Sequence, residues 1–233
     1  MRRSFVAVSA MVLVSGCAAN YVATPYVAGP ERVARVAVAD DSVPENLSAD
    51  EVASVGSNFG LIGALIDAGV QESRQDALED ALETISFDAE ATLERFVVDA
   101  LAQDGVQATV LDGPQRQRRV FLAQYPGAPE GVQAYLDIVL TNYGYVSAGS
   151  GQPWRPTAYA LVRLVSVSNR RVLLENHISY NTMQAPRGVI TLTPNPEYEF
   201  RNREELVADP ERLANGIRDA MRQIATTAAG LMR

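Results

Sequence analysis

The sequence predicts an α+β domain with a mixed sheet of about five strands, helices packed on one face and a long antiparallel hairpin. Two observations predict this fold class. Between residues 33 and 111, an alternating apolar segment, a helical segment and a second alternating segment follow one another, as in a βαβ unit. From residue 136 onward, three further alternating segments occur in succession, and a short turn joins the last two.

The composition suits one soluble domain and excludes several functional classes. The 233 residues contain 47% hydrophobic and 21% charged side chains, close to the average for globular proteins. A net charge of −8 argues against nucleic acid as the partner. A single cysteine and a single histidine exclude a disulfide framework and a histidine-rich metal centre. We therefore expect no cofactor and no bound metal.

The first predicted strand covers residues 33–39, in which valine and alanine alternate. It ends at Asp40 and Asp41, a pair that could bind a cation or serve as acid and base but is more typical of a turn. Residues 48–51 match a capping box, which predicts the start of a short helix.

Residues 56–70 combine glycine with large apolar side chains, including Gly56, Gly60 and Gly63. Glycine in a helix costs about 1 kcal/mol relative to alanine, so the missing side chains should serve some purpose. One interpretation is a buried helix or loop packed against the sheet. The other is a small-residue surface for self-association or shallow membrane contact.

A helix is predicted over residues 89–103, because its apolar side chains recur at helical spacing, Asp88 can cap its start and Gly105 follows its end. Residues 106–111 form the next predicted strand. The following segment carries a small basic cluster of Arg116, Arg118 and Arg119. Such a cluster is usually a solvated loop, but it could bind an acidic partner or a lipid head group.

The second half of the chain predicts three strands and a helix. The strands cover residues 136–148, 157–167 and 171–181, the last two forming the hairpin. Residues 182–208 are rich in proline and polar residues, which predicts a loop or lid. Residues 209–211 then provide a cap, a proline and an acid, which predict a helix that continues to the C-terminus.

The N-terminus has the pattern of an exported protein. Arg2 and Arg3 precede an apolar stretch of 10 residues, too short to span a bilayer but typical of a signal peptide. Directly after it come Val14, Ser15, Gly16 and Cys17. This motif resembles the lipobox of bacterial lipoproteins, with valine where leucine is commonest.

The resemblance implies cleavage before Cys17 by the lipoprotein signal peptidase, a diacylglyceryl group on its sulfur and an acyl chain such as palmitate on its new amine. Ala18, in place of aspartate, favours the outer membrane of a Gram-negative bacterium, with the domain on the periplasmic face. We expect a signal peptide over residues 1–16, a lipidated tether over 17–32 and a single periplasmic α+β domain over 33–233. Loss of Arg2 and Arg3 leaves 18 basic and 28 acidic side chains, so lipid rather than charge would anchor the protein.

Known catalytic sequence motifs are absent, and we expect a protein that is not an enzyme. His177 lies in the middle of a predicted strand, where a packing role is more common than a catalytic one. Trp154, the single tryptophan, lies in a predicted loop beside an arginine. It is either an exposed anchor for a partner, with Tyr143 and Tyr145 nearby, or a lid over the end of the sheet.

The predicted order of elements is distantly similar to that of periplasmic α+β lipoproteins such as the curli-secretion lipoprotein and the N-terminal domain of the Tol translocation protein. The likeness rests on residues 35–39 and on the hairpin of residues 157–181. Our first hypothesis is a non-enzymatic binding or envelope-assembly factor with a periplasmic protein partner. The alternatives are a self-assembling secretion or transport accessory, as a homo-oligomer, and a cell-envelope hydrolase that uses His177.

Overall fold

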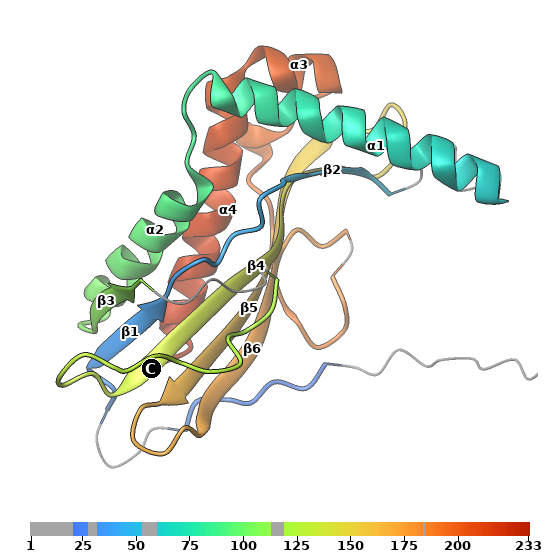
Figure 1. Cartoon of the computed structure of the whole chain (residues 1–233). Helices are drawn as coiled ribbons and strands as arrows, with labels where there is room; N and C mark the ends of the chain where they lie inside the picture. The colour runs from blue at the N-terminus through green and yellow to red at the C-terminus, as the bar shows by residue number, and fades with distance from the viewer. Residues whose placement is uncertain (1–20, 28–31, 53–59, 113–118, 184) are drawn as a thin grey trace, which may run out of the picture.

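The computed structural model describes residues 21–27, 32–52, 60–112, 119–183 and 185–233, with side chains in the first helix from Glu72 onward. In chain order, the elements are β1 (Arg35–Ala39), β2 (Ser48–Glu51), α1 (Gly60–Glu83), α2 (Ala89–Gln103), β3 (Gln107–Leu111), β4 (Ala134–Ser147), β5 (Trp154–Ser166), β6 (Val172–Tyr180), β7 (Ile190–Leu192), the 3₁₀ turn η2 (Pro196–Tyr198), α3 (Arg203–Ala208) and α4 (Pro210–Gly230). Figure 1 shows their arrangement.

A mixed sheet forms the centre of the fold, in the order β3-β1-β4-β5-β6-β7, with β2 paired to β4. Strand β1 is parallel to β3 and β4, whereas β4, β5 and β6 are antiparallel. The predicted α+β class is confirmed, including the βαβ unit and the long hairpin. The sheet has seven strands rather than about five, because β2 and β7 were not predicted.

Strand β2 occupies the segment for which a capping box predicted a helix, so that prediction is wrong. Residues Ser48–Glu51 pair in parallel with Gly144–Ser147 of β4. At Gly144 the backbone has φ +136°, and a Cβ there would lie 2.1 Å from the Ser48 carbonyl oxygen. The strand therefore depends on a glycine almost a hundred residues away, which local sequence cannot reveal.

Helices α2 and α4 cover one face of the sheet (Figure 1). Helix α2 has the predicted bounds, and the Asp88 side chain accepts a hydrogen bond from the Ala91 amide at 2.9 Å. Helix α4 begins at the predicted Asp209 cap. The core between helices and sheet is built from fully buried aliphatic side chains, among them Leu93, Leu101, Leu136, Ile138, Leu140, Val162, Leu164, Ile178, Ile217, Met221 and Ile224.

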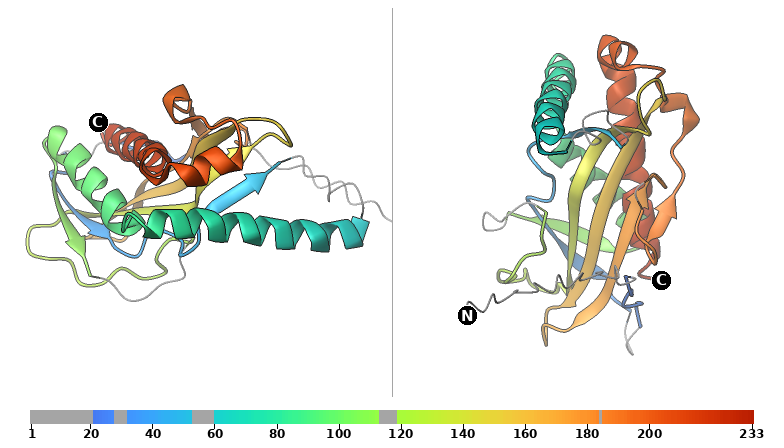
Figure 2. Two further views of the ribbon diagram at one scale, coloured as in Figure 1. Left: turned by 90° about the horizontal axis from the view of Figure 1, so that it is seen from above. Right: turned by 90° about the vertical axis from the view of Figure 1, so that its right-hand side faces the viewer.

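Helix α1 contains most of the glycine-rich stretch. Gly60 and Gly63 lie in its first turns, whereas Gly56 falls outside the described residues. The second half of α1 contacts β2, α3 and α4, and Figure 2 shows the first half extending beyond the end of the sheet. Within the described ranges, no helix is both long enough and apolar enough to cross a bilayer.

The opposite face of the sheet, called here the open face, has no helix packed on it among the described elements. The segment of residues 119–131 crosses part of it and is held by Asp137, whose carboxylate accepts hydrogen bonds from the Leu122 amide (2.9 Å) and the Tyr125 hydroxyl (3.0 Å). The Tyr135 ring stacks on Tyr125, with the centroids 4.9 Å apart. Polar and aromatic side chains thus take part in the packing on this face.

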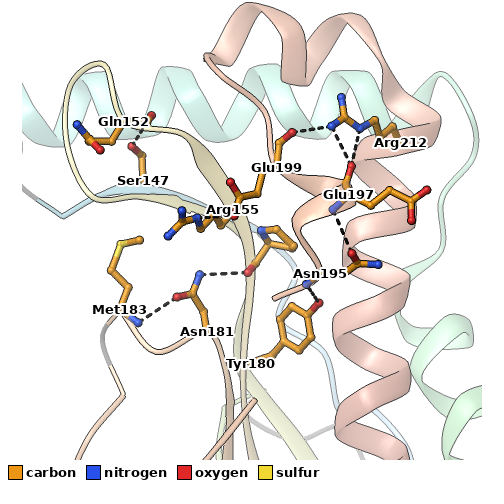
Figure 3. A network of polar contacts seen from close by, with 11 residues as sticks. Ser147, Gln152, Arg155, Tyr180, Asn181, Met183, Asn195, Glu197, Glu199 and Arg212 are labelled. Atoms are coloured by element: carbon orange, nitrogen blue, oxygen red, sulfur yellow. Dashed lines mark hydrogen bonds and ion pairs between the residues drawn. The ribbon is translucent and has the colours of Figure 1, made fainter. Parts of the chain in front are cut away.

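The segment predicted as a loop or lid contains β7, η2 and α3, and it is fastened to the domain (Figure 3). The Arg212 guanidinium donates hydrogen bonds to the carbonyl oxygens of Glu197 and Glu199. The Tyr180 hydroxyl accepts one from the Asn195 amide at 2.9 Å. These contacts make the segment part of the structural frame rather than a free lid.

Candidate functional site

A hollow of about 310 Å³ lies at the end of the sheet where β5 begins, and we call it the Trp154 hollow. Four stretches of chain that are distant in sequence surround it. They are Glu51 of β2, Arg74 of α1, the turn before Trp154 and the start of α3, which together contribute Glu51, Arg74, Gly149, Ser150, Gly151, Gln152, Trp154, Arg201, Asn202, Arg203 and Glu204.

Trp154 forms one wall of the hollow and is held firmly. Its backbone exchanges two hydrogen bonds with Phe200, at 2.7 and 3.0 Å, and only 6% of the residue is exposed. The Arg74 guanidinium lies over the indole ring, 5.9 Å from its centroid. Two roles were considered for Trp154, an exposed anchor for a partner and a lid over the end of the sheet. The structure favours the lid, because the residue is almost fully buried.

Arg74 is the most unusual group of the hollow. One of its terminal nitrogens, Nη2, forms an ion pair with Glu51, and only 15% of the Arg74 side chain is exposed. The other, Nη1, is buried and has no hydrogen-bond partner within the part of the chain that the structure describes. A buried donor left unpaired costs about 1–3 kcal/mol, more for a charged group, so the site favours a ligand that supplies an acceptor.

Two further arginines carry positive charge to the rim. Arg201 pairs with Glu205 one helical turn along, and its guanidinium holds the pKa of Glu205 below its usual range. Arg203 is half-buried, and no carboxylate of the described chain pairs with it. Three arginines and two acids, Glu51 and Glu204, line the Trp154 hollow, and Glu205 beside it pairs with Arg201.

The turn that closes the hollow is fixed by one buried hydroxyl. The Ser147 Oγ atom lies 3.0 Å from the carbonyl oxygens of Gly149 and Gln152 in the turn. Figure 3 shows the contact with Gln152. Beside the turn, Arg155 pairs with Glu199, Nε lying 2.8 Å from Oε1. The site is therefore shaped before any ligand arrives, which lowers the entropic cost of binding.

Arg119, the residue of the predicted basic cluster that the structure describes, does not line this hollow. Arg119 is exposed at the start of the segment that Asp137 holds on the open face, and Asp137 lies opposite Arg163 in the register of β4 and β5. Nine residues of β5 separate Arg163 from Trp154, or about 30 Å. Arg116 and Arg118 lie outside the described residues, as do Val14, Ser15, Gly16 and Cys17.

Tyr143 and Tyr145, considered as neighbours of an exposed Trp154, are buried on the helix side of β4. The Tyr145 hydroxyl donates a hydrogen bond to the Leu213 carbonyl at 3.3 Å, and burial raises the pKa of Tyr145 well above its usual range. They belong to the core. The bulge in β4 between Leu140 and Asn142 reverses the alternation that sequence reasoning assumed.

His177 lies on the open face between two tyrosines. The Tyr21 ring stacks on the imidazole at a centroid distance of 3.7 Å, and the Tyr159 hydroxyl lies 3.0 Å from Nδ1. Burial lowers the pKa of His177 and raises that of Tyr21 to about 12. Neutral, stacked rings at this position bind the segment of residues 21–27 to the sheet.

Three carboxylates meet where β1 ends: Asp40, Glu90 and Glu94, whose oxygens lie within 4.8 Å of one another. Glu90 accepts hydrogen bonds from the Ser42 and Val43 amides, at 2.7 and 2.8 Å. Burial raises the pKa of Glu94 to about 7, together with a hydrogen bond to Asp40 and the neighbouring acids. This set could hold a cation, or it can share a proton between Asp40 and Glu94.

A second, smaller hollow of about 220 Å³ lies on the open face. Hydroxyl and amide groups line it, including those of Thr141, Asn142, Thr157 and Asn181. The Asn142 Oδ1 atom is buried and accepts no hydrogen bond from the described residues. It offers uncharged hydrogen-bonding groups, whereas the Trp154 hollow offers charge. Among the described residues, Trp154 is the only one singled out as a binding candidate from the sequence that lines one of these two hollows. Arg74 and Arg203 had no sequence signal.

Comparison with known proteins gives distant structural similarities. No protein-family model matches the sequence, and no curated protein is significantly similar. A Xanthomonas campestris protein of the DUF330 family is 13% identical, with a TM-score of 0.42 and coverage of 88% of this chain and 84% of that one. PelC from Paraburkholderia phytofirmans, solved as a dodecamer, is 11% identical, with a TM-score of 0.38 and coverage of 88% and 95%. A dodecameric variant of PelC gives a TM-score of 0.37 at 11% identity, with coverage of 89% and 97%.

Proposed function

We propose that this protein is a non-enzymatic binding or assembly factor of the bacterial envelope, anchored by lipid on Cys17 to the periplasmic face of the outer membrane. Its binding site is the Trp154 hollow, and the group it recognises is an anion, a carboxylate or a phosphate. The observation that carries the proposal is the buried Arg74 Nη1 atom, which has no hydrogen-bond partner among the described residues.

An anion suits the hollow for a simple electrostatic reason. Arg203 has no ion-pair partner in the described chain, and Arg74 has one nitrogen to spare beside its pair with Glu51. Guanidinium groups bind carboxylates and phosphates through paired hydrogen bonds, which are about twice as strong as neutral ones. In a chain with a net charge of −8, an anionic partner is favoured where arginines gather, and the Trp154 hollow is one such place.

The chain contains its own reporter for this test. Trp154 is the only tryptophan and lines the hollow, so its fluorescence can follow titration with inorganic phosphate and with acetate. We expect the Trp154 fluorescence to change and to reach saturation as the anion concentration rises. Arg203→Gln should weaken the apparent affinity about tenfold, because one charged hydrogen bond is lost.

Arg222→Gln is the matched control, since Arg222 pairs with Asp219 on α4 and does not line the hollow. The apparent affinity of this variant for the anion should stay within about twofold of that of the parent protein. Arg74→Gln should also weaken binding, and circular dichroism would show whether the fold survives loss of the pair with Glu51. A titration curve unchanged in both hollow variants would reject the site.

The anchoring part of the proposal is tested by mass. The protein, expressed with its full leader and extracted from its membrane in mild detergent, should have a chain that begins at Cys17 and carries three acyl chains. Retention of residues 1–16 without added lipid would reject the anchor. It would leave the fluorescence titration unaffected, so the two parts of the proposal can fail separately.

Self-assembly is a second candidate function, favoured by the first half of α1. This half extends beyond the sheet in Figure 2, and its sequence between Gly60 and Val70 is almost entirely apolar. A helix that is apolar around its circumference is normally covered. Gly63→Leu should therefore change the native mass of the detergent-extracted particle if copies pack at this helix. An unchanged mass would remove the support for the assembly.

A further inference from the structure

The N-terminal segment of residues 21–27, predicted as part of a loose tether, is docked on the sheet. The Thr24 amide donates to the Glu175 carbonyl at 2.8 Å, and the Glu175 amide donates to the Thr24 carbonyl at 2.9 Å. This antiparallel bridge lies on the half of β6 that β7 leaves uncovered. The Tyr21 amide adds a third hydrogen bond, 3.2 Å from the Arg187 carbonyl. Figure 1 shows the segment beside β6.

The close approach of Tyr21 requires a glycine. A Cβ at Gly188 would lie 2.2 Å from the Tyr21 carbonyl oxygen, and the φ of +87° at Gly188 is one that other residues rarely adopt. The Tyr21 ring meanwhile stacks on His177. Backbone, ring and glycine together fix where the chain enters the domain.

Docking limits how far Cys17 can lie from this edge. Four peptide units join Cys17 to Tyr21, so the sulfur-bearing residue lies within about 14 Å of it, even if the chain between them is fully extended. If Cys17 is lipidated, as proposed above, the acyl chains leave the body of the protein beside β6. A longer free tether would have left the orientation undetermined.

The surface beside this entry point is apolar. Of the five large hydrophobic residues that are clearly exposed in the described chain, three lie here: Val22 (82%), Val27 (76%) and Val172 (42%). Val172 begins β6, three residues before the bridge at Glu175. We call Val22, Val27 and Val172 the valine edge.

Basic residues flank the valine edge in an otherwise acidic protein. Arg170 and Arg171 precede Val172 in the hairpin turn, and Arg187 accepts the hydrogen bond from Tyr21. All three are exposed, and Glu175, the acid of β6, is paired with Arg163. Apolar side chains with arginines beside them are the combination that favours the interface of a phospholipid bilayer.

From these observations we infer that the valine edge is the membrane-facing surface of the protein, with Val22, Val27 and Val172 in contact with the bilayer. The inference rests on the proposed lipid anchor. It also orients the rest of the molecule. Val172 pairs with Val165, eleven residues from Trp154 along β5, so the Trp154 hollow opens about 35 Å from the membrane end of the strand.

Site-specific labelling of the full lipidated protein tests the inference. Lipid consumes Cys17, the only native cysteine, so a cysteine introduced elsewhere is the only free thiol. Val172→Cys would be labelled with a fluorophore, and the protein would be placed in phosphatidylethanolamine–phosphatidylglycerol vesicles with brominated acyl chains. We expect quenching at least threefold stronger than at the control position.

Val52→Cys is the matched control, because it changes the same residue type at nearly the same exposure, 44%, beside β2. Equal quenching at the two positions, or stronger quenching at position 52, would overturn the inference. Intact mass separates the causes of failure. An unmodified Cys17 would reject the anchor and the valine edge together, whereas a lipidated Cys17 with an unquenched label would reject the valine edge alone.

Gly188→Ala provides a second test that leaves the valines in place. The added methyl group meets the Tyr21 carbonyl, so the segment should undock and quenching at position 172 should fall at least twofold, with the same lipid mass. Gly105→Ala is the control, since its φ of +73° is similar but nothing lies within 4 Å of the added carbon. Undiminished quenching in Gly188→Ala would show that docking does not orient the protein.

Discussion

The two faces of strands β4, β5 and β6 use different residue types, although the same strands supply both. Toward α2 and α4 the side chains are aliphatic and fully buried, such as Leu136 and Val162. Toward the open face, apolar side chains such as Val139 and Leu161 alternate with charged and aromatic ones. Asp137 and His177 are two of the latter, and they hold segments of irregular chain. The comparison indicates that the two faces have different structural roles. One face supplies the free energy of folding, and the other determines where the N-terminal segment and residues 119–131 lie.

The largest expected effect is on the free energy of unfolding, and it compares one substitution on each face of the sheet. Leu136→Ala opens a cavity under the helices and should lower the free energy of unfolding by about 2–5 kcal/mol. Leu161→Ala, at a half-buried position on the open face, should cost about 1 kcal/mol. Urea denaturation would measure both. Equal losses would contradict a division between the two faces.

The next effect concerns the buried carboxylate of the open face. Asp137→Ala leaves the Leu122 amide and the Tyr125 hydroxyl without their acceptor, which should cost about 2–3 kcal/mol. The segment of residues 119–131 should then become sensitive to brief proteolysis. Asp76→Ala, which removes an exposed acid of α1, is the control. Cleavage at the same rate in both variants would show that Asp137 does not hold the segment.

The smallest effect is a dependence on pH that arises outside the two faces, at the end of β1. The folded-state pKa of Glu94 is raised to about 7, so the folded protein binds the proton more tightly than the unfolded chain. The stabilisation is present below the pKa of an ordinary glutamate and is lost as the pH rises through about 7.

Glu94→Gln keeps a hydrogen-bond donor for Asp40 and removes the titration. The variant should therefore gain stability relative to the parent between pH 5 and pH 8, by about 1 kcal/mol or less because the site is partly solvated. Denaturation midpoints at both pH values would measure the gain. Glu83→Gln, at an exposed position of α1, is the control, and a difference that stays constant with pH would contradict the assignment.

Much of the helix-covered face could be predicted from the sequence, because its signals are local. Asp88 and Gly105 mark the ends of α2, Asp209 marks the start of α4, and alternation marks the strands of the hairpin. Each of these signals, a cap or an apolar periodicity, comes from residues close together in the sequence that belong to a single helix or strand. The expected α+β class followed from the order of these elements.

The missed parts depend on contacts between residues that are far apart in the chain. Strand β2 requires Gly144, and docking of Tyr21 requires Gly188. The residues around each glycine give no sign of the distant segment that packs against it. The Trp154 hollow combines Arg74 with Arg203, from helices that the folded chain brings together. Sequence reasoning identified Trp154 by its rarity, and could not know which arginines would surround it.

The bridge between Thr24 and Glu175 also has a consequence for the order of assembly. On the proposed export route the chain emerges with its N-terminus first, so Thr24 reaches the periplasm 151 residues ahead of its partner. If Cys17 is cleaved and acylated during export, as proposed, those steps act on a segment whose partner has not yet been translocated, and docking follows once β6 has crossed. A chain whose export is arrested before residue 175 is expected to be lipidated but undocked.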